Sequence, residues 1–235
     1  MNALDEDGFL LYMKERRNSP GKIRSYINRM KRFENYVTEH EVGKAMKDLT
    51  IEDLEKYVEW CKENNVNPYL EFFGIREYFR FLGIKELPYT CNQIMQMIQL
   101  EKFKLKDFLT ADQESAKKLA GIGIKTASQI LEVGKTIKER EILAGKSGVP
   151  VDEVLKFVKL ANLARCPGHM KKRACLYYEA GLDTFDKIAE QDPELMVKFL
   201  DDFIKKTSFD GSAPILGDAR SSIENSKRIP RIIEF

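Results

Sequence analysis

The chain has 235 residues, of which 43% are hydrophobic and 32% are charged, a composition typical of a folded protein with a well-solvated surface. Its 39 Lys and Arg against 37 Asp and Glu leave a formal net charge of +2, which excludes the strongly basic profile of a dedicated nucleic-acid coat but allows local basic patches. No apolar run approaches the roughly 20 residues that a membrane span needs, and the first residues are acidic where a signal peptide starts basic. We therefore expect a soluble, cytoplasmic protein with no membrane association, whose four scattered cysteines are buried thiols.

Apolar residues recur at helical spacing throughout the chain, and convincing strand alternation is missing. Four helices are expected in the first part of the chain, over residues 8–17, 20–37, 51–61 and 68–82. The last three begin at helix-start signals, which are Ser19-Pro20, Thr50 and Asn67-Pro68. Gly83 is expected to end the fourth helix.

Residues 89–104 have mixed signals and are expected to link two domains, at residues 1–88 and 105–235. A helix over residues 93–99 is compatible with part of this linker. Beyond it the pattern changes to short helices separated by turns that contain glycine. Further helices are expected at about 137–146, 151–163 and 193–205, with a last one before Ile229-Pro230.

The second domain contains an internal repeat with an offset of 47 residues. The positions that match under this shift are Gly121 with Gly168, Lys125 with Lys172, Ala127 with Ala174, Glu132 with Glu179 and Gly134 with Gly181. Each copy is expected to hold a turn followed by a helix that ends at its last glycine.

The turn of the first copy has the chemistry of an anion site. Gly121, Ile122 and Gly123 let the backbone approach a ligand closely, because glycine has no side chain in the way. The helix N-terminus that follows favours an anion, and Lys125 and Thr126 add a charge and a hydroxyl. A nucleic-acid phosphate, bound without regard to base sequence, is the natural ligand. Walker A and dinucleotide-binding loops are excluded, because their required glycines are missing around Lys125.

The string Leu119-Ala-Gly-Ile-Gly-Ile-Lys-Thr-Ala127 resembles the helix-hairpin-helix motif. The resemblance implies non-specific binding of the DNA backbone through the amides of the hairpin. The second copy departs from the motif, because Met170 stands where the second glycine is expected. Its candidate contacts are Gly168 in the turn and Lys171, Lys172 and Arg173, which can attract phosphate by their charge. The alternative for both copies is a pair of hairpins that packs purely as scaffold.

The later part of the chain extends this resemblance. The strings over residues 160–168, 178–185, 189–193 and 222–230 are similar to a bacterial and archaeal domain family of unknown function that is built from tandem helix-hairpin-helix motifs. The similarity covers roughly residues 105–233. It implies a fold but no activity.

The first part of the chain resembles the N-terminal core-binding domain of tyrosine recombinases and phage integrases. The strings that carry the resemblance cover residues 9–16, 23–26, 49–54 and 75–82. In that family a four-helix, SAM-like domain clamps one side of the DNA duplex. The expected fold class is therefore all-α, with a four-helix SAM-like bundle followed by a tandem helix-hairpin-helix domain.

Charge is unevenly distributed in this first domain. Residues 10–38 hold eight basic and two acidic residues, whereas residues 39–63 hold eight acidic and four basic ones. The basic residues of the second helix that we expect to contact phosphates are Lys22, Arg24, Arg29, Lys31 and Arg32. Such binding should weaken steeply with salt. The alternative is an ordinary solvated helix surface.

The sequence gives no sign of catalysis. The catalytic Arg, Lys, His and Tyr set of a tyrosine recombinase is not recognisable after residue 104, where His169 is the one histidine. Cys166, His169 and Cys175 lack a fourth metal ligand. We therefore expect a non-catalytic protein, without metal or cofactor, that binds duplex DNA. A protein-interaction scaffold is the competing class, a nuclease or recombination factor is a third, and the oligomeric state is left open.

Overall fold

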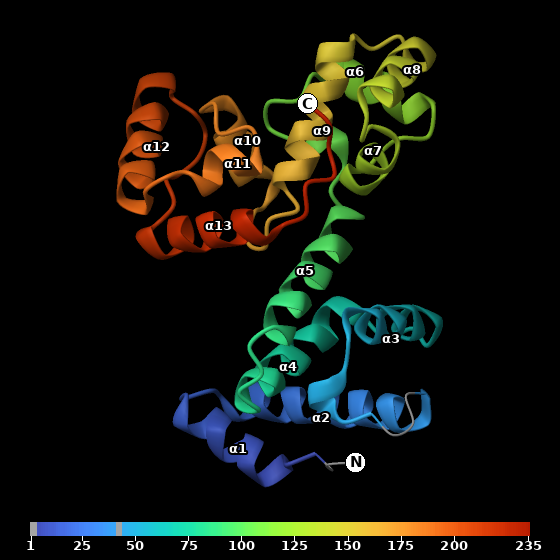
Figure 1. Ribbon diagram of the computed structural model, residues 1–235, viewed down its shortest axis with the longest axis vertical. Coiled ribbons are helices and arrows are strands. Elements are labelled where there is room, and N and C mark those ends of the chain that lie inside the picture. Colours follow the sequence, from blue (N-terminus) through green and yellow to red (C-terminus); the bar gives the residue numbers. More distant parts are fainter. Residues whose placement is uncertain (1–3, 41–43) are drawn as a thin grey trace. The chain divides into compact units, whose positions relative to one another are not determined.

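The computed structural model describes residues 4–40 and 44–235 and is all-α (Figure 1). Residues 1–3 and 41–43, which include Glu41 of the acidic stretch, lie outside this description. Within the described ranges there is no strand, and a single isolated antiparallel bridge joins Lys104 to Thr126. The expected all-α class is confirmed. The chain divides into two compact units, Met1–Ile98 and Gln99–Phe235, each with its own core.

The first unit is built around the long helix α2, which packs against α1 and α4. Its helices are α1 (Glu6–Glu15), α2 (Pro20–His40), α3 (Ile51–Glu63), α4 (Pro68–Phe81) and α5 (Leu87–Leu100), with a 3-10 turn at Met46–Asp48. Thr50 caps α3 through a full capping box with Asp53. Gly74 allows α4 to approach α2, because a Cβ there would lie 3.1 Å from the Arg29 Cβ.

Helix α5 replaces most of the linker that we expected over residues 89–104. Its apolar side chains recur every three or four residues and are buried in the first core, at Leu87, Cys91, Ile94, Met95 and Ile98. Pro88, which indicated a break, lies in the first turn of the helix, where a proline costs no hydrogen bond. The first unit therefore has five helices rather than four, and its compact part ends at Ile98 rather than at residue 88.

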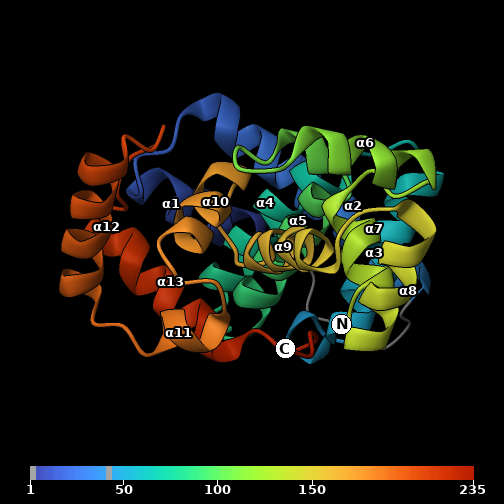
Figure 2. The same ribbon diagram turned by 90° about the horizontal axis from the view of Figure 1, so that it is seen from above.

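The second unit is arranged around helix α9. Its helices are α6 (Gln113–Gly121), α7 (Ala127–Val133), α8 (Ile137–Ser147), α9 (Val151–Leu163), α10 (Lys171–Glu179), α11 (Phe185–Ala189), α12 (Pro193–Thr207) and α13 (Leu216–Arg228), after a 3-10 turn at Leu105–Asp107. α9 packs against α7 and α8 on one side and against α10 on the other (Figures 1 and 2). Its side chains are therefore buried on both flanks, as Val154, Phe157, Leu160 and Ala161 show.

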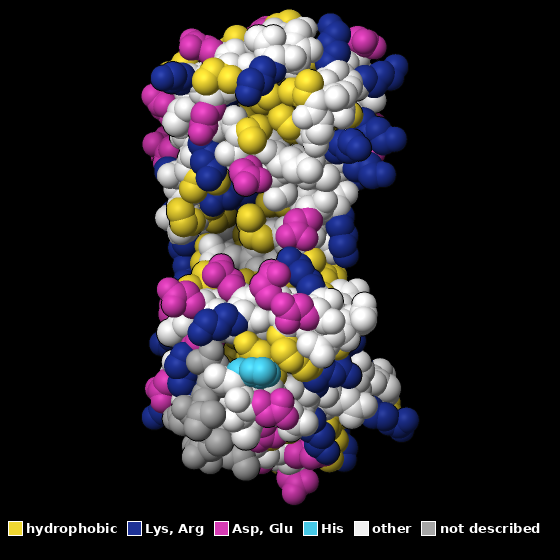
Figure 3. All heavy atoms as spheres, turned by 90° about the vertical axis from the view of Figure 1, so that its right-hand side faces the viewer, with side chains coloured by type: hydrophobic (Ala, Val, Ile, Leu, Met, Phe, Trp, Pro, Cys, Tyr) yellow, Lys and Arg dark blue, Asp and Glu magenta, His cyan; other side chains and the backbone are white. Residues whose placement is uncertain are grey.

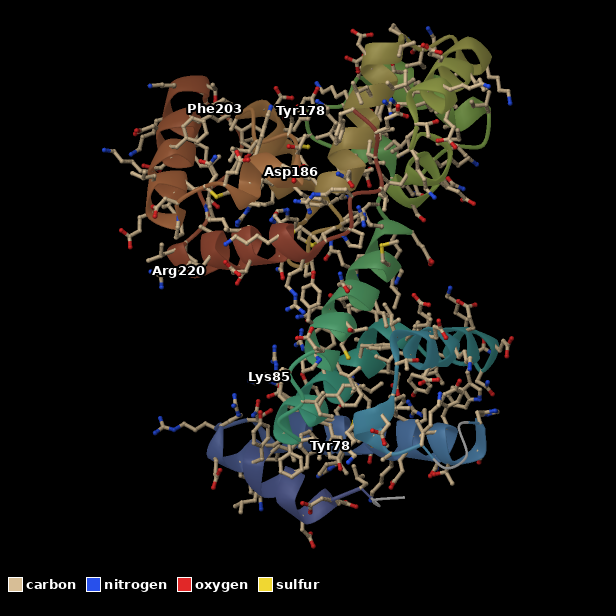
Figure 4. The ribbon with its side chains drawn as sticks, in the orientation of Figure 1. Tyr78, Lys85, Tyr178, Asp186, Phe203 and Arg220 are labelled. Carbon is tan, nitrogen blue, oxygen red and sulfur yellow. The ribbon has the colours of Figure 1, made fainter. Side chains whose placement is uncertain are left out.

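Residues 229–235 form an extended segment, which we call the C-terminal strap. The Glu234 amide donates to the Lys135 carbonyl at 2.9 Å, and the Glu234 carboxylate accepts from the Ile137 amide at 3.3 Å. Arg231 binds Asp186 of α11, labelled in Figure 4, through Nε at 3.0 Å and Nη2 at 2.7 Å. The strap thereby ties the start of α8 to the α11–α13 part of the unit.

The four cysteines are buried and free, as expected. In the part of the chain that the structure describes, none of the helices combines the length and apolar character that a bilayer span requires.

Candidate nucleic-acid interface

The first hairpin, residues 119–127, is a tight turn between α6 and α7. Gly123 follows the end of α6 in the left-handed conformation, with φ of +92°. The Ile124 amide donates to the Leu119 carbonyl at 3.0 Å and the Gly123 amide to the Ala120 carbonyl at 3.1 Å, which is the Schellman arrangement. Gly123 therefore serves to end α6, since a residue with a Cβ would be strained there.

The amides of this turn already have partners within the protein. The Ile122 amide donates to the Leu119 carbonyl at 3.2 Å. The Lys125 and Thr126 amides both donate to the Gln129 side-chain oxygen, at 2.7 and 3.1 Å. Gly121 itself is the last residue of α6. Gln129 closes a capping box and the Schellman bonds take further donors, so the amides of the expected phosphate cradle around Gly121 to Gly123 are hydrogen-bonded within the protein.

A second segment lies directly beside the first hairpin. The Leu105 amide donates to the Lys125 carbonyl at 2.9 Å, and the Ala127 amide donates to the Phe103 carbonyl at 2.7 Å. Phe103 and Leu105 are buried in the second core. The residues on either side of these two, at positions 102, 104 and 106, are exposed.

Exposed lysine side chains form a group that we call the lysine edge, made of Lys102, Lys104, Lys106 and Lys125. None of them has an ion pair with any residue that the structure describes. Of this group, only Lys125 was predicted from the sequence. The other three share a signal that could have revealed them, the strict alternation Lys-Phe-Lys-Leu-Lys over residues 102–106.

Lys171 of the second hairpin lies beside the segment that carries the lysine edge. Its ammonium group bonds the Asp107 carboxylate at 2.8 Å and lies 5.6 Å from the centroid of the Phe103 ring. The hydrogen bond from Lys171, aided by the charges of Lys106 and Lys104, lowers the pKa of Asp107. Asp107 thus pairs with Lys171, whereas the four lysines of the lysine edge have no ion pair with the described residues.

The second hairpin, residues 166–174, is built differently from the first. Ala174 is fully buried like its repeat partner Ala127, so the repeat holds inside the helices. However, α10 begins at Lys171, three residues before Ala174, whereas α7 begins at Ala127 itself. Gly168 has φ of +86° and therefore corresponds in conformation to Gly123, not to its aligned partner Gly121.

The basic residues at the start of α10 are each paired with an aspartate. Lys171 pairs with Asp107, Lys172 with Asp210 at 2.9 Å and Arg173 with Asp218 at 3.4 Å. Exposed pairs of this kind contribute little to stability but compensate the local charge. The positive charge that the sequence places at the second hairpin is therefore largely paired within the protein.

His169 lies in the turn of the second hairpin and is almost fully buried. Its Nε2 lies 2.8 Å from the Ser222 hydroxyl of α13 and its Nδ1 lies 3.1 Å from the Leu163 carbonyl. Burial lowers the pKa of His169 to about 3. The imidazole is thus a neutral connector between helices. Across the described ranges, no group of three or more His, Cys, Asp or Glu side chains could hold a metal ion.

The neutral His169 predicts a pH-dependent stability. In the unfolded chain the imidazole titrates near its ordinary pKa of 6.5, so between pH 6.5 and 3 the unfolded state binds a proton that the folded state excludes. The stability that depends on a neutral His169 is fully present above pH 6.5. On acidification below that pH, the free energy of unfolding falls by about 1.4 kcal/mol per pH unit. Urea unfolding of the protein and of His169→Gln at several pH values measures it. The free-energy difference between the two should shrink as the pH falls; a constant difference contradicts the assignment, and His40→Gln is the exposed-histidine control.

Three of the five basic residues expected to contact phosphate on α2 are engaged in ion pairs. Arg32 bonds the buried Glu71 carboxylate at 2.7 Å, and the Arg29 Nε lies 4.0 Å from the same oxygen. Lys31 pairs with Glu6 at 2.7 Å. Lys22 and Arg24 are exposed and have no carboxylate partner among the residues described. Of the five expected phosphate contacts on α2, Arg29 and Arg32 therefore also hold α2 against α4.

Comparison with known families gave two matches. A model described as "Domain of unknown function (DUF4332)" matches residues 110–229, and one described as "Phage integrase, N-terminal SAM-like domain" matches residues 7–69. The expected SAM-like domain at the N-terminus is thereby confirmed. Comparisons with curated proteins and with solved structures gave no significant match.

Proposed function

The chain belongs to the family described as "Domain of unknown function (DUF4332)", and since that description assigns no activity, we propose from the geometry that its second unit binds the phosphate backbone of duplex DNA without sequence preference. The observation that carries the proposal is the lysine edge. Lysine side chains in such a group act as point charges toward phosphates and carry no information about base sequence. The match of residues 7–69 to an integrase SAM-like domain adds a second reason to consider DNA.

The role of the first hairpin changes with this proposal. In the helix-hairpin-helix resemblance the amides would contact the phosphate, but here they hold the turn together. The rigid turn instead fixes the Lys125 backbone beside residues 103–105, so that four ammonium groups share one edge. Arg24 and Lys22 of the first unit are the remaining candidates for contacts elsewhere on the chain.

A double substitution of Lys104 and Lys125 by Gln tests the lysine edge. If both lysines neutralise phosphates, the slope of log affinity against log salt should become less steep by about two, with a uniform loss of affinity across sequences. Fluorescence anisotropy with two labelled duplexes of unrelated sequence, at several salt concentrations, measures both quantities. No binding of the unaltered protein at low salt would rule out the proposal.

The matched control is the double variant Lys198→Gln and Lys206→Gln. Both lysines are exposed on α12 and have no ion pair with the described residues. Their substitution removes the same charge as the substitution of Lys104 and Lys125. This variant should keep the slope of the unaltered protein. Equal effects of the two double variants would mean that net charge alone, not the lysine edge, drives binding.

A protein-interaction scaffold is the second candidate. The observation that favours it is a set of large apolar side chains on and near α12 that remain in contact with solvent, namely Leu195 (67% exposed), Phe199 (45%) and Ile215 (71%). Exposed apolar groups of this size often mark contact sites between proteins. This candidate gains weight if duplex DNA is not bound and if sedimentation velocity shows a self-association that Leu195→Ser with Phe199→Ser abolishes.

We also propose that the chain is not an enzyme. In its support, His169 is buried and held by two hydrogen bonds, and the Tyr177 hydroxyl is buried against Ser222. A nuclease assay on duplex DNA with Mg²⁺ or Mn²⁺ tests this, and cleavage above that of a mock preparation contradicts it.

A further inference from the structure

Three aromatic rings form a cup where the C-terminal end of α2 meets α3. The centroid of the Tyr36 ring lies 4.7 Å from that of His40 and 5.5 Å from that of Trp60. Tyr36 is only 5% exposed and forms the floor, whereas His40 and Trp60 reach the surface. Trp60 stacks on the buried ring of Tyr57, at 13° between planes, so its indole is held in place from behind.

Carboxylates surround the open side of the cup. Glu59 and Glu63 line it together with Lys56, and the cavity has a volume of about 430 Å³. Glu39 lies next to His40, with 4.0 Å between its carboxylate and the His40 Nε2. Lys56 is directed to the buried Asp53 at 3.9 Å, and Lys62 bonds Glu59 at 3.0 Å. Figure 3 shows one face of the molecule, on which a histidine side chain lies next to hydrophobic side chains with acidic side chains close by.

The combination of aromatic rings and carboxylates in the cup favours a positively charged ligand. The face of an aromatic ring attracts a cation, and Trp does so most strongly. Carboxylates at the rim attract a cation further and repel a phosphate, so the cup is unsuited to the nucleic-acid backbone. A purely apolar ligand would use the rings but gain nothing from the acidic rim.

We propose that the cup of Tyr36, His40 and Trp60 is a binding site for an organic cation, the ammonium or guanidinium group of a basic side chain on a partner protein. The cation contacts the Trp60 ring, above the buried Tyr36, and is neutralised by Glu63. The site is independent of DNA binding by the second unit, and each can fail without the other.

Trp60 is the single tryptophan of the chain, so its fluorescence reports on the cup directly. The full-length protein is titrated with choline at constant ionic strength and, in parallel, with 3,3-dimethylbutan-1-ol, which has the same shape without the charge. A saturable change in Trp60 emission with choline, and at least a tenfold weaker response to the neutral analogue, is expected. Equal responses to both compounds, or no saturable change with choline, would overturn the proposal.

Variants separate the acidic rim from a general charge effect. Glu63→Gln should weaken choline binding by roughly three- to tenfold, and His40→Ala should weaken it through loss of one wall. Glu15→Gln removes the same charge from an exposed position on α1 and should leave the affinity unchanged. A Glu63→Gln variant that binds as tightly as Glu15→Gln would contradict the role of the rim.

Three peptides then distinguish the source of the cation. They carry one lysine, one trimethyl-lysine or one arginine in an otherwise identical neutral sequence. Tightest binding of the trimethyl-lysine peptide identifies a methylated partner, and tightest binding of the arginine peptide identifies an unmodified one. Binding of choline but of none of the peptides would overturn the assignment to a protein partner.

Discussion

Replacement of Arg140 by methionine is expected to lower the free energy of unfolding of the second unit by about 3 kcal/mol. Arg140 is 3% exposed, and its guanidinium donates to the carbonyls of Gly134 at 3.0 Å, Lys135 at 3.1 Å and Glu234 at 2.7 Å. Hydrogen bonds from a charged donor contribute more than neutral ones, and their removal takes this donor from the Gly134 and Glu234 carbonyls. Methionine keeps most of the packing volume, so the loss reports on the hydrogen bonds.

Two optical signals locate this effect. Circular dichroism in the far ultraviolet follows the helices of both units, whereas Trp60 fluorescence follows only the first unit. Arg140→Met should shift the former and leave the fluorescence transition unchanged. Lys138→Met, at an exposed position two residues earlier on α8, is the control. If both variants unfold like the unaltered protein, the strap contributes nothing measurable.

Replacement of Glu71 by glutamine is expected to destabilise the first unit by about 2–3 kcal/mol. The Glu71 carboxylate is buried and accepts from Arg32 at 2.7 Å and from the Tyr57 hydroxyl at 3.1 Å. Removal of one partner from a buried pair leaves a buried charge without compensation, here the 18% exposed Arg29. Because Arg32 is 42% exposed, water offsets part of this loss.

Urea unfolding followed by Trp60 fluorescence measures the Glu71 effect. Glu59→Gln is the matched control, since Glu59 forms only an exposed pair with Lys62 and its replacement should change stability by less than about 0.5 kcal/mol.

The pairing of Arg29 and Arg32 with Glu71 also has a consequence for DNA binding. Arg29→Gln and Arg32→Gln should reduce stability more than affinity for duplex DNA, and the reverse result would show that these arginines contact DNA.

The helix starts could be predicted from sequence because their signals are local. Thr50 and Asp53 lie three residues apart and form the capping box of α3, and Asn67-Pro68 directly precedes α4. Pro88 misled the prediction at α5, because a proline both breaks helix interiors and starts helices. Only the apolar spacing from Leu87 to Ile98 distinguishes the two cases.

The candidate interface could be predicted only in part, because its decisive contacts join residues far apart in the chain. Lys125 was recognised within a local motif, but its neighbour Lys104 is placed by an antiparallel bridge across 22 residues. Arg32 pairs with Glu71, which lies 39 residues later in the chain, and Lys172 pairs with Asp210, which lies 38 residues later. No local pattern reveals which basic side chains such pairs neutralise.

The C-terminal strap also bears on the order in which the second unit acquires its structure. The contacts of Glu234 with Ile137 and Arg140 join residues 97 and 94 positions apart. Closure of so large a loop is slow compared with the local pairing of neighbouring helices. During synthesis α6 to α9 are therefore expected to assemble first, and the hydrogen bond from Arg140 to the Glu234 carbonyl can form only once residue 234 has left the ribosome.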